Sequence, residues 1–165
     1  MALTPSFSSF EAGWNAGRNQ VVYTRLAADL DTPVSLMLKL SDAGTDSFML
    51  ESVTGGEVRG RYSIVGMKPD LIWQCHGAQS RINREARFDR QSFTDLAGHP
   101  LQTLRDLLAE CRIEMPEGMP AVSAGLFGYL GYDMIRLVEH LPNVNPDPLG
   151  LPDAELIRPS VVAVL

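Results

Sequence analysis

Residues 47–66 read Ser-Phe-Met-Leu-Glu-Ser-Val-Thr-Gly-Gly-Glu-Val-Arg-Gly-Arg-Tyr-Ser-Ile-Val-Gly. The apolar run at 48–50 is typical of a short, half-buried strand. The glycine pair at 55–56 can adopt positive φ, and a second β-type run begins at Arg61. This stretch therefore predicts two antiparallel strands joined by a loop of more than two residues.

Glu51 and Ser52 follow the apolar run directly, so their polar groups lie at the edge of the expected core. A buried polar group without a partner costs about 1–3 kcal/mol, so a carboxylate at this place needs water or a partner. Glu51 is expected to face water, to pair with Arg59 or Arg61, or to bind the ammonium group of a ligand. From the pattern alone, a solvated strand end with a nearby ion pair is the simplest interpretation.

The rest of the chain predicts an α+β fold with helices packed on a mixed or antiparallel sheet. Thr32-Pro33 has the N-cap residue and the first-turn proline of a helix that ends at Gly44. Strands are predicted at 61–65, 71–75 and 79–82, and the last two are joined across His76-Gly77-Ala78 as a hairpin. Lys68-Pro69-Asp70 is expected to separate the first two of these strands.

Later segments complete this prediction. Pro100 begins the clearest helix, whose expected core face consists of Leu101, Leu104, Leu107, Leu108 and Cys111. A second helix is expected from Asp133 to the residue before Pro142, and the glycines at 125, 128 and 131 predict the close approach of another backbone. Shorter elements are expected at 7–14 (helix), at 21–25, near Phe88 and at 160–165 (strands).

Composition indicates one ordinary globular domain over residues 1–165, with 45% hydrophobic and 21% charged residues. The net charge of −6 argues against nucleic acid or an anionic membrane as the main partner, because such surfaces attract clustered Lys and Arg. No signal peptide or membrane-spanning run is recognisable, so a cytoplasmic location is expected.

No pattern in the sequence predicts catalysis. Cys75 and Cys111 lack the spacing of a zinc site, and the glycine repeat lacks the Lys-Ser/Thr of a phosphate-binding loop. We therefore expect no catalytic residue, no cofactor-binding residue and no metal ligand in this chain.

Two motifs resemble the N-terminal region of anthranilate synthase component I, a chorismate-utilising enzyme. The first is Leu50-Glu51-Ser52-Val53 with the block Gly60-Arg61-Tyr62-Ser63-Ile64-Val65-Gly66, and the second is Gly125-Leu126-Phe127-Gly128-Tyr129-Leu130-Gly131-Tyr132-Asp133 with Arg136 and Glu139. The resemblance implies that Leu50, Glu51 and Ser52 line an allosteric pocket for tryptophan. It raises the ligand interpretation of Glu51 and Ser52 above that of a solvated strand end.

The resemblance also implies a parent lyase of tryptophan biosynthesis. That enzyme converts chorismate and ammonia to anthranilate and pyruvate under feedback inhibition by tryptophan, and a glutamine amidotransferase subunit supplies the ammonia. Mg²⁺ and the residues that act on chorismate are implied to belong to a C-terminal chorismate-binding domain. Residues 1–165 are then the N-terminal regulatory domain of a larger two-part enzyme, inactive alone, and the apolar run at 160–165 is expected to continue into that enzyme.

Two alternatives stay open. The chain also fits the N-terminal domain of aminodeoxychorismate synthase component I, a relative that serves folate synthesis, although the Glu51-Ser52 pair and the block at 60–66 fit anthranilate synthase better. The other alternative is a stand-alone amino-acid-binding domain.

Overall fold

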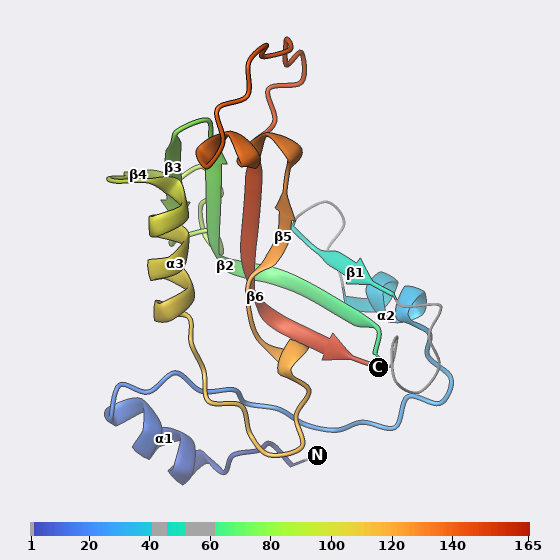
Figure 1. Cartoon of the computed structure of the whole chain (residues 1–165). Helices are drawn as coiled ribbons and strands as arrows, with labels where there is room; N and C mark the ends of the chain where they lie inside the picture. Colours follow the sequence, from blue (N-terminus) through green and yellow to red (C-terminus); the bar gives the residue numbers. More distant parts are fainter. Residues whose placement is uncertain (1, 41–45, 52–61) are drawn as a thin grey trace. The chain divides into compact units, whose positions relative to one another are not determined.

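A computed structural model of the chain describes residues 2–40, 46–51 and 62–165 (Figure 1). The elements are α1 Phe7–Asn15, α2 Pro33–Leu40, β1 Phe48–Leu50, β2 Ile64–His76, β3 Gln79–Asn83, β4 Thr94–Leu96, α3 Pro100–Glu110, β5 Phe127–Leu130 and β6 Ala154–Val164, with the 3-10 helices η1 Ala121–Ser123 and η2 Tyr132–Leu137. The predicted α+β fold with an antiparallel sheet is confirmed.

The sheet is built around β2. Its strand order is β4-β3-β2-β6-β5, and β1 pairs separately with β2. Strands β1, β3 and β6 are thus all neighbours of β2, and the pairings of β1 and β3 with it are antiparallel. Just before β2, Ser63 exchanges both backbone hydrogen bonds with Leu165, at 3.0 and 2.9 Å. With three neighbouring strands, β2 supplies several of the most buried side chains, such as Val65 and Trp73.

The chain divides into two compact units. The first comprises residues 1–67, 111–125 and 161–165, and the second comprises residues 68–110 and 126–160. The first unit contains α1, α2, β1 and η1, whereas the second contains β3, β4, α3, β5 and η2. The inclusion of residues 1–165 in one domain of a larger protein stays a prediction.

The core of the second unit forms where α3 contacts β3. Leu104 and Leu107 are buried three residues apart on the helix, as the spacing predicts. Trp73 is fully buried, and its indole nitrogen donates a hydrogen bond to Thr103 of α3 at 3.3 Å. Leu108 was expected in this core, but it is 52% exposed.

Strand β2 corrects the prediction of two strands separated at Lys68-Pro69-Asp70. Residues 64–76 form one strand, and Lys68 within it has a φ of 54°. This left-handed residue lets the strand pass through Pro69, which has no N–H to give to a neighbouring strand. Sequence punctuation that usually ends a strand therefore marks an irregularity inside one.

Three further expectations differ from the structure. Residues 21–25 contribute only an isolated bridge between Tyr23 and Thr4. Phe88 is 83% exposed in a turn, and the strand of that region is β4 instead. The helix expected from Asp133 to the residue before Pro142 is the shorter 3-10 helix η2.

The glycine repeat has the predicted role. A Cβ on Gly128 would lie 1.9 Å from the carbonyl oxygen of Glu155, and one on Gly131 would lie 2.7 Å from that of Asp153. Both positions lie where the backbone of β5 and its continuation approaches the backbone of β6 and its preceding residue. Among the described residues, no helix has the length and apolar character that a membrane crossing requires.

Candidate functional site

The predicted site begins at the end of β1. Leu50 lies opposite Ile64 of β2, which is only 7% exposed, but Leu50 itself is 50% exposed. Glu51 follows directly and is exposed. The structure thus presents both residues at the surface of the first unit, whereas Ser52, Arg59 and Arg61 lie outside the described residues.

Helix α2 contacts β1 and has a well-defined start. The backbone N–H of Thr32 donates to Ser35 Oγ at 2.9 Å, and the backbone N–H of Ser35 donates to Thr32 Oγ1 at 3.1 Å. This reciprocal pair confirms Thr32 as the predicted N-cap. Hydrogen bonds from Lys39 and Ser35 lower the pKa of the preceding Asp31 carboxyl, and this carboxylate suits the positive end of the helix.

Apolar side chains remain exposed on both elements that meet here. Val34 and Leu38 of α2 are exposed, as are Met49 and Leu50 of β1. The first unit therefore carries accessible apolar surface on the same elements that lead to the Glu51 carboxylate. Such a combination suits a small ligand that has both an apolar part and a cationic group.

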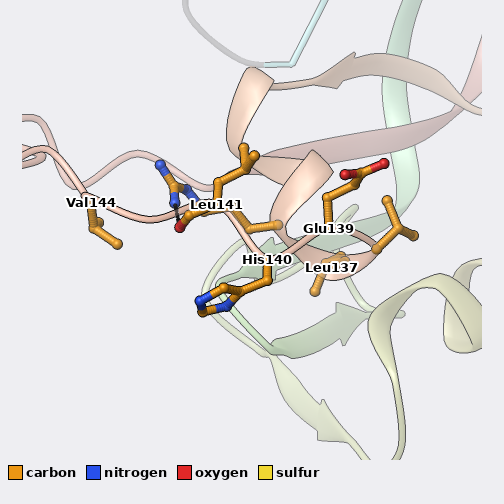
Figure 2. Close-up of a pocket in the computed structure, with 7 residues that line it drawn as sticks. Leu137, Glu139, His140, Leu141 and Val144 are labelled. Atoms are coloured by element: carbon orange, nitrogen blue, oxygen red, sulfur yellow. Dashed lines mark hydrogen bonds between the residues drawn. The ribbon is translucent and has the colours of Figure 1, made fainter.

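A shallow hollow of about 490 Å³ lies in the second unit (Figure 2). Its lining consists of Arg136, Leu137, Val138, Glu139, His140, Leu141 and Val144. The Arg136 guanidinium already donates to Asp133 Oδ1 at 2.6 Å and to the Leu141 carbonyl at 3.0 Å. Figure 2 shows Glu139 and His140 pointing in different directions. Because these polar groups do not converge on one point, we assign no binding site to the hollow.

A row of polar side chains crosses three strands of the second unit. Arg81 Nε on β3 donates to Gln74 Oε1 on β2 at 2.8 Å, and Gln74 Nε2 donates to Glu155 on β6. The Arg81 guanidinium also lies 4.5 Å from the ring centroid of Phe93. Each of these polar groups has a partner within the row, so we interpret it as a structural feature that ties the strands together. No sequence motif connects positions 74, 81 and 155, and the sequence therefore did not predict the row.

Tyr129 of β5 lies directly opposite Glu155 at one end of this row. Its hydroxyl donates to the Pro152 carbonyl at 2.9 Å. Desolvation raises the pKa of Tyr129, and the carboxylates of Glu155 and Asp153 raise it further. The phenol therefore stays protonated at neutral pH and serves as a hydrogen-bond donor.

The cysteines and histidines have structural surroundings. Burial raises the pKa of the Cys75 thiol to about 11, so the thiol is protonated at neutral pH and is a poor nucleophile. His99 Nδ1 accepts a hydrogen bond from the backbone of Leu101 at 3.3 Å, which confirms its predicted place at the start of α3. In the part of the chain that the structure describes, no three His, Cys, Asp or Glu residues gather to hold a metal ion.

Comparison with protein-family profiles finds no match. Among curated proteins, the chain is 79% identical over 160 residues to anthranilate synthase component 1 of Cereibacter sphaeroides, which covers 97% of this chain and 32% of that protein. It is 40% identical over 143 residues to anthranilate synthase component 1 of Pseudomonas aeruginosa, covering 83% of this chain and 27% of that protein. The resemblance predicted from the two motifs is thereby confirmed.

Among solved structures, the fold is similar to the crystal structure of anthranilate synthase component I from Streptococcus pneumoniae. The TM-score is 0.51 at 20% sequence identity, over 86% of this chain and 28% of that one. This likeness supports the fold, whereas the kinship rests on the sequence identities. The chain spans 32% of its Cereibacter relative and is, over nearly its whole length, a homologue of that part of anthranilate synthase component 1.

Proposed function

We propose that this chain is the N-terminal, tryptophan-sensing region of an anthranilate synthase component I. The observation that carries the proposal is the 79% identity to such a protein over 97% of the chain. Names of further relatives agree, since homologues from Acinetobacter calcoaceticus and Thermus thermophilus are also called anthranilate synthase component 1. These names favour anthranilate synthase over the aminodeoxychorismate alternative.

The parent enzyme aminates chorismate with ammonia and releases pyruvate to form anthranilate. Its chorismate-binding domain contains the catalytic residues and Mg²⁺, and an amidotransferase subunit delivers ammonia from glutamine. No described residues of this chain gather to hold a metal ion, so we assign no step of the reaction to them. The contribution of this region is regulation rather than chemistry, and the region alone forms no anthranilate.

The regulatory site consists of Leu50, Glu51 and Ser52. The exposed Leu50 side chain supplies apolar contact for the indole ring, and the exposed Glu51 carboxylate accepts the α-ammonium group of tryptophan. Ser52 hydrogen-bonds the ligand or fixes the wall of the pocket. Residues of the second domain complete the pocket, so tryptophan inhibits by binding one arrangement of the two domains better than another.

The test is the initial rate of anthranilate formation by the full-length protein with its amidotransferase component, followed by product fluorescence. With chorismate and glutamine present, we expect fluorescence to appear and added tryptophan to suppress it. The absence of anthranilate would contradict the enzymatic part of the proposal. Anthranilate formation that is insensitive to tryptophan would contradict the regulatory part alone.

A further inference from the structure

Strand β1 is short and has little in its own sequence to fix its position. Its three residues Phe-Met-Leu are all apolar, so no alternation of polar and apolar side chains distinguishes one register from the next. A shift by one residue along β2 would move the end of β1 by about 3.3 Å and turn each side chain to the opposite face. The observed register therefore needs another determinant.

That determinant is a ring packed against a glycine. Phe48 lies directly opposite Gly66, which is the only glycine of β2. A Cβ on Gly66 would lie 2.3 Å from both Cε1 and Cζ of the Phe48 ring, a distance too short for any real contact. The ring thus occupies space that is free only because residue 66 has no side chain.

Neighbouring registers offer no such space. A shift of β1 by one residue in either direction would place Phe48 opposite Val65 or Met67, whose side chains are 0% and 3% exposed. Aromatic side chains that cover a glycine on the neighbouring strand are a known means of pinning strand register. The pairing of Leu50 with Ile64, two residues further along β1, follows from this one contact.

We propose that Phe48 and Gly66 are positioning residues for the tryptophan site, because their contact fixes the register of β1 and so the place of Leu50 and Glu51. The inference rests on the proposed function, since it concerns the same site. Neither residue touches the ligand. Loss of their contact changes how well tryptophan is sensed and leaves the chemistry of the parent enzyme in place.

The experiment measures kcat and the tryptophan concentration for half-inhibition in the full-length protein with its amidotransferase component. For Gly66→Ala we expect a rise in the half-inhibitory concentration of about tenfold, an ordinary size for coupling between sites, while kcat stays close to the wild-type value. Gly77→Ala is the matched control. It is the same substitution at a strained turn glycine (φ 54°) with nothing within 4 Å of the new Cβ, and we expect wild-type inhibition.

Phe48→Ala removes the ring without adding an atom to β2, and it keeps the test decisive even where Gly66→Ala folds poorly. We expect the same loss of sensitivity, and we expect Gly66→Ala to have little further effect in the Phe48→Ala background, because the added methyl group then meets no ring. Wild-type inhibition in both single variants would overturn the positioning proposal and leave the proposed function intact. Equal loss of kcat in the Gly66 and Gly77 variants would overturn it too, because a general loss of stability would then explain both. A wild-type enzyme that tryptophan does not inhibit would refute the proposed function itself.

Discussion

Glu110 at the end of α3 is the residue whose protonation state most clearly depends on one neighbour. Arg84 donates to both carboxylate oxygens, at 2.5 and 2.7 Å. This pairing lowers the pKa of Glu110 below its usual 4.5, although burial opposes the shift. A carboxyl group with a lowered pKa in the folded state stabilises the protein above that usual value. The stabilisation disappears as the pH falls through the lower, folded-state pKa.

We therefore expect Arg84→Met to lower the free energy of unfolding at pH 7 by at most about 1 kcal/mol, since both side chains are half exposed and water screens the pair. The difference between variant and wild type should vanish in acid, when Glu110 is protonated in both. Urea unfolding over a pH series measures this. In a Glu110→Gln background the arginine substitution should have a smaller effect, and a difference independent of pH would contradict the interpretation.

Thr103 shows how one hydroxyl holds an element in place. It donates to the Pro100 carbonyl at 2.8 Å, so it can only accept hydrogen bonds from the Trp73 indole and the Ser80 hydroxyl, at 3.3 and 2.8 Å. The contact of α3 with β2 and β3 thus includes a fully paired buried polar group.

Replacing Thr103 by Val keeps the shape of the side chain but leaves buried donors on Trp73 and Ser80 without acceptors. We expect a loss of about 1–3 kcal/mol in the free energy of unfolding. Urea unfolding followed by tryptophan fluorescence reports on the change. Thr103→Ser, which keeps the hydroxyl, is the control and should lose less; equal losses in the two variants would indicate that the methyl group matters rather than the hydrogen bonds.

Strands β5 and β6 depend on a glycine in the same element-level way. Gly128 has a φ of 155°, and a Cβ there would lie 1.9 Å from the Glu155 carbonyl oxygen. We expect Gly128→Ala to reduce the free energy of unfolding by about 3 kcal/mol, at the upper end of the usual range for single substitutions. Gly150→Ala, at a loop glycine with open space around it, should cost about 1 kcal/mol. Similar unfolding midpoints for the two variants would contradict this account of β5.

The sequence predicted those elements whose start or turn has a local chemical cause. Thr32-Pro33 begins α2, Pro100 begins α3, and His76-Gly77-Ala78 joins β2 to β3. It did not predict what depends on distant contacts. Arg136 donates to the Leu141 carbonyl and to Asp133, and such side-chain hydrogen bonds compete with the regular helix expected there. For the candidate site, the motif identified Leu50 and Glu51, but the Phe48–Gly66 contact becomes visible only once β1 is paired with β2.

At the scale of the whole molecule, the chain spans only 32% of its Cereibacter relative, and in our proposal the tryptophan pocket needs residues from the rest of the protein. We therefore expect isolated residues 1–165 to bind tryptophan weakly or undetectably and to form no anthranilate. Isothermal titration calorimetry of the fragment beside the full-length protein measures the difference. Binding of equal affinity by both would show that the pocket is complete within this chain.

The most direct test of the tryptophan-sensing role is the inhibition curve of full-length Ser52→Phe beside that of the wild type, followed by anthranilate fluorescence with the amidotransferase component present. The phenyl ring is expected to fill the space that the ligand needs at the proposed site. We predict that tryptophan inhibits the wild type and that the variant continues to form anthranilate at tryptophan concentrations that silence it. Equal inhibition of both proteins would contradict the assignment of the site to Leu50, Glu51 and Ser52.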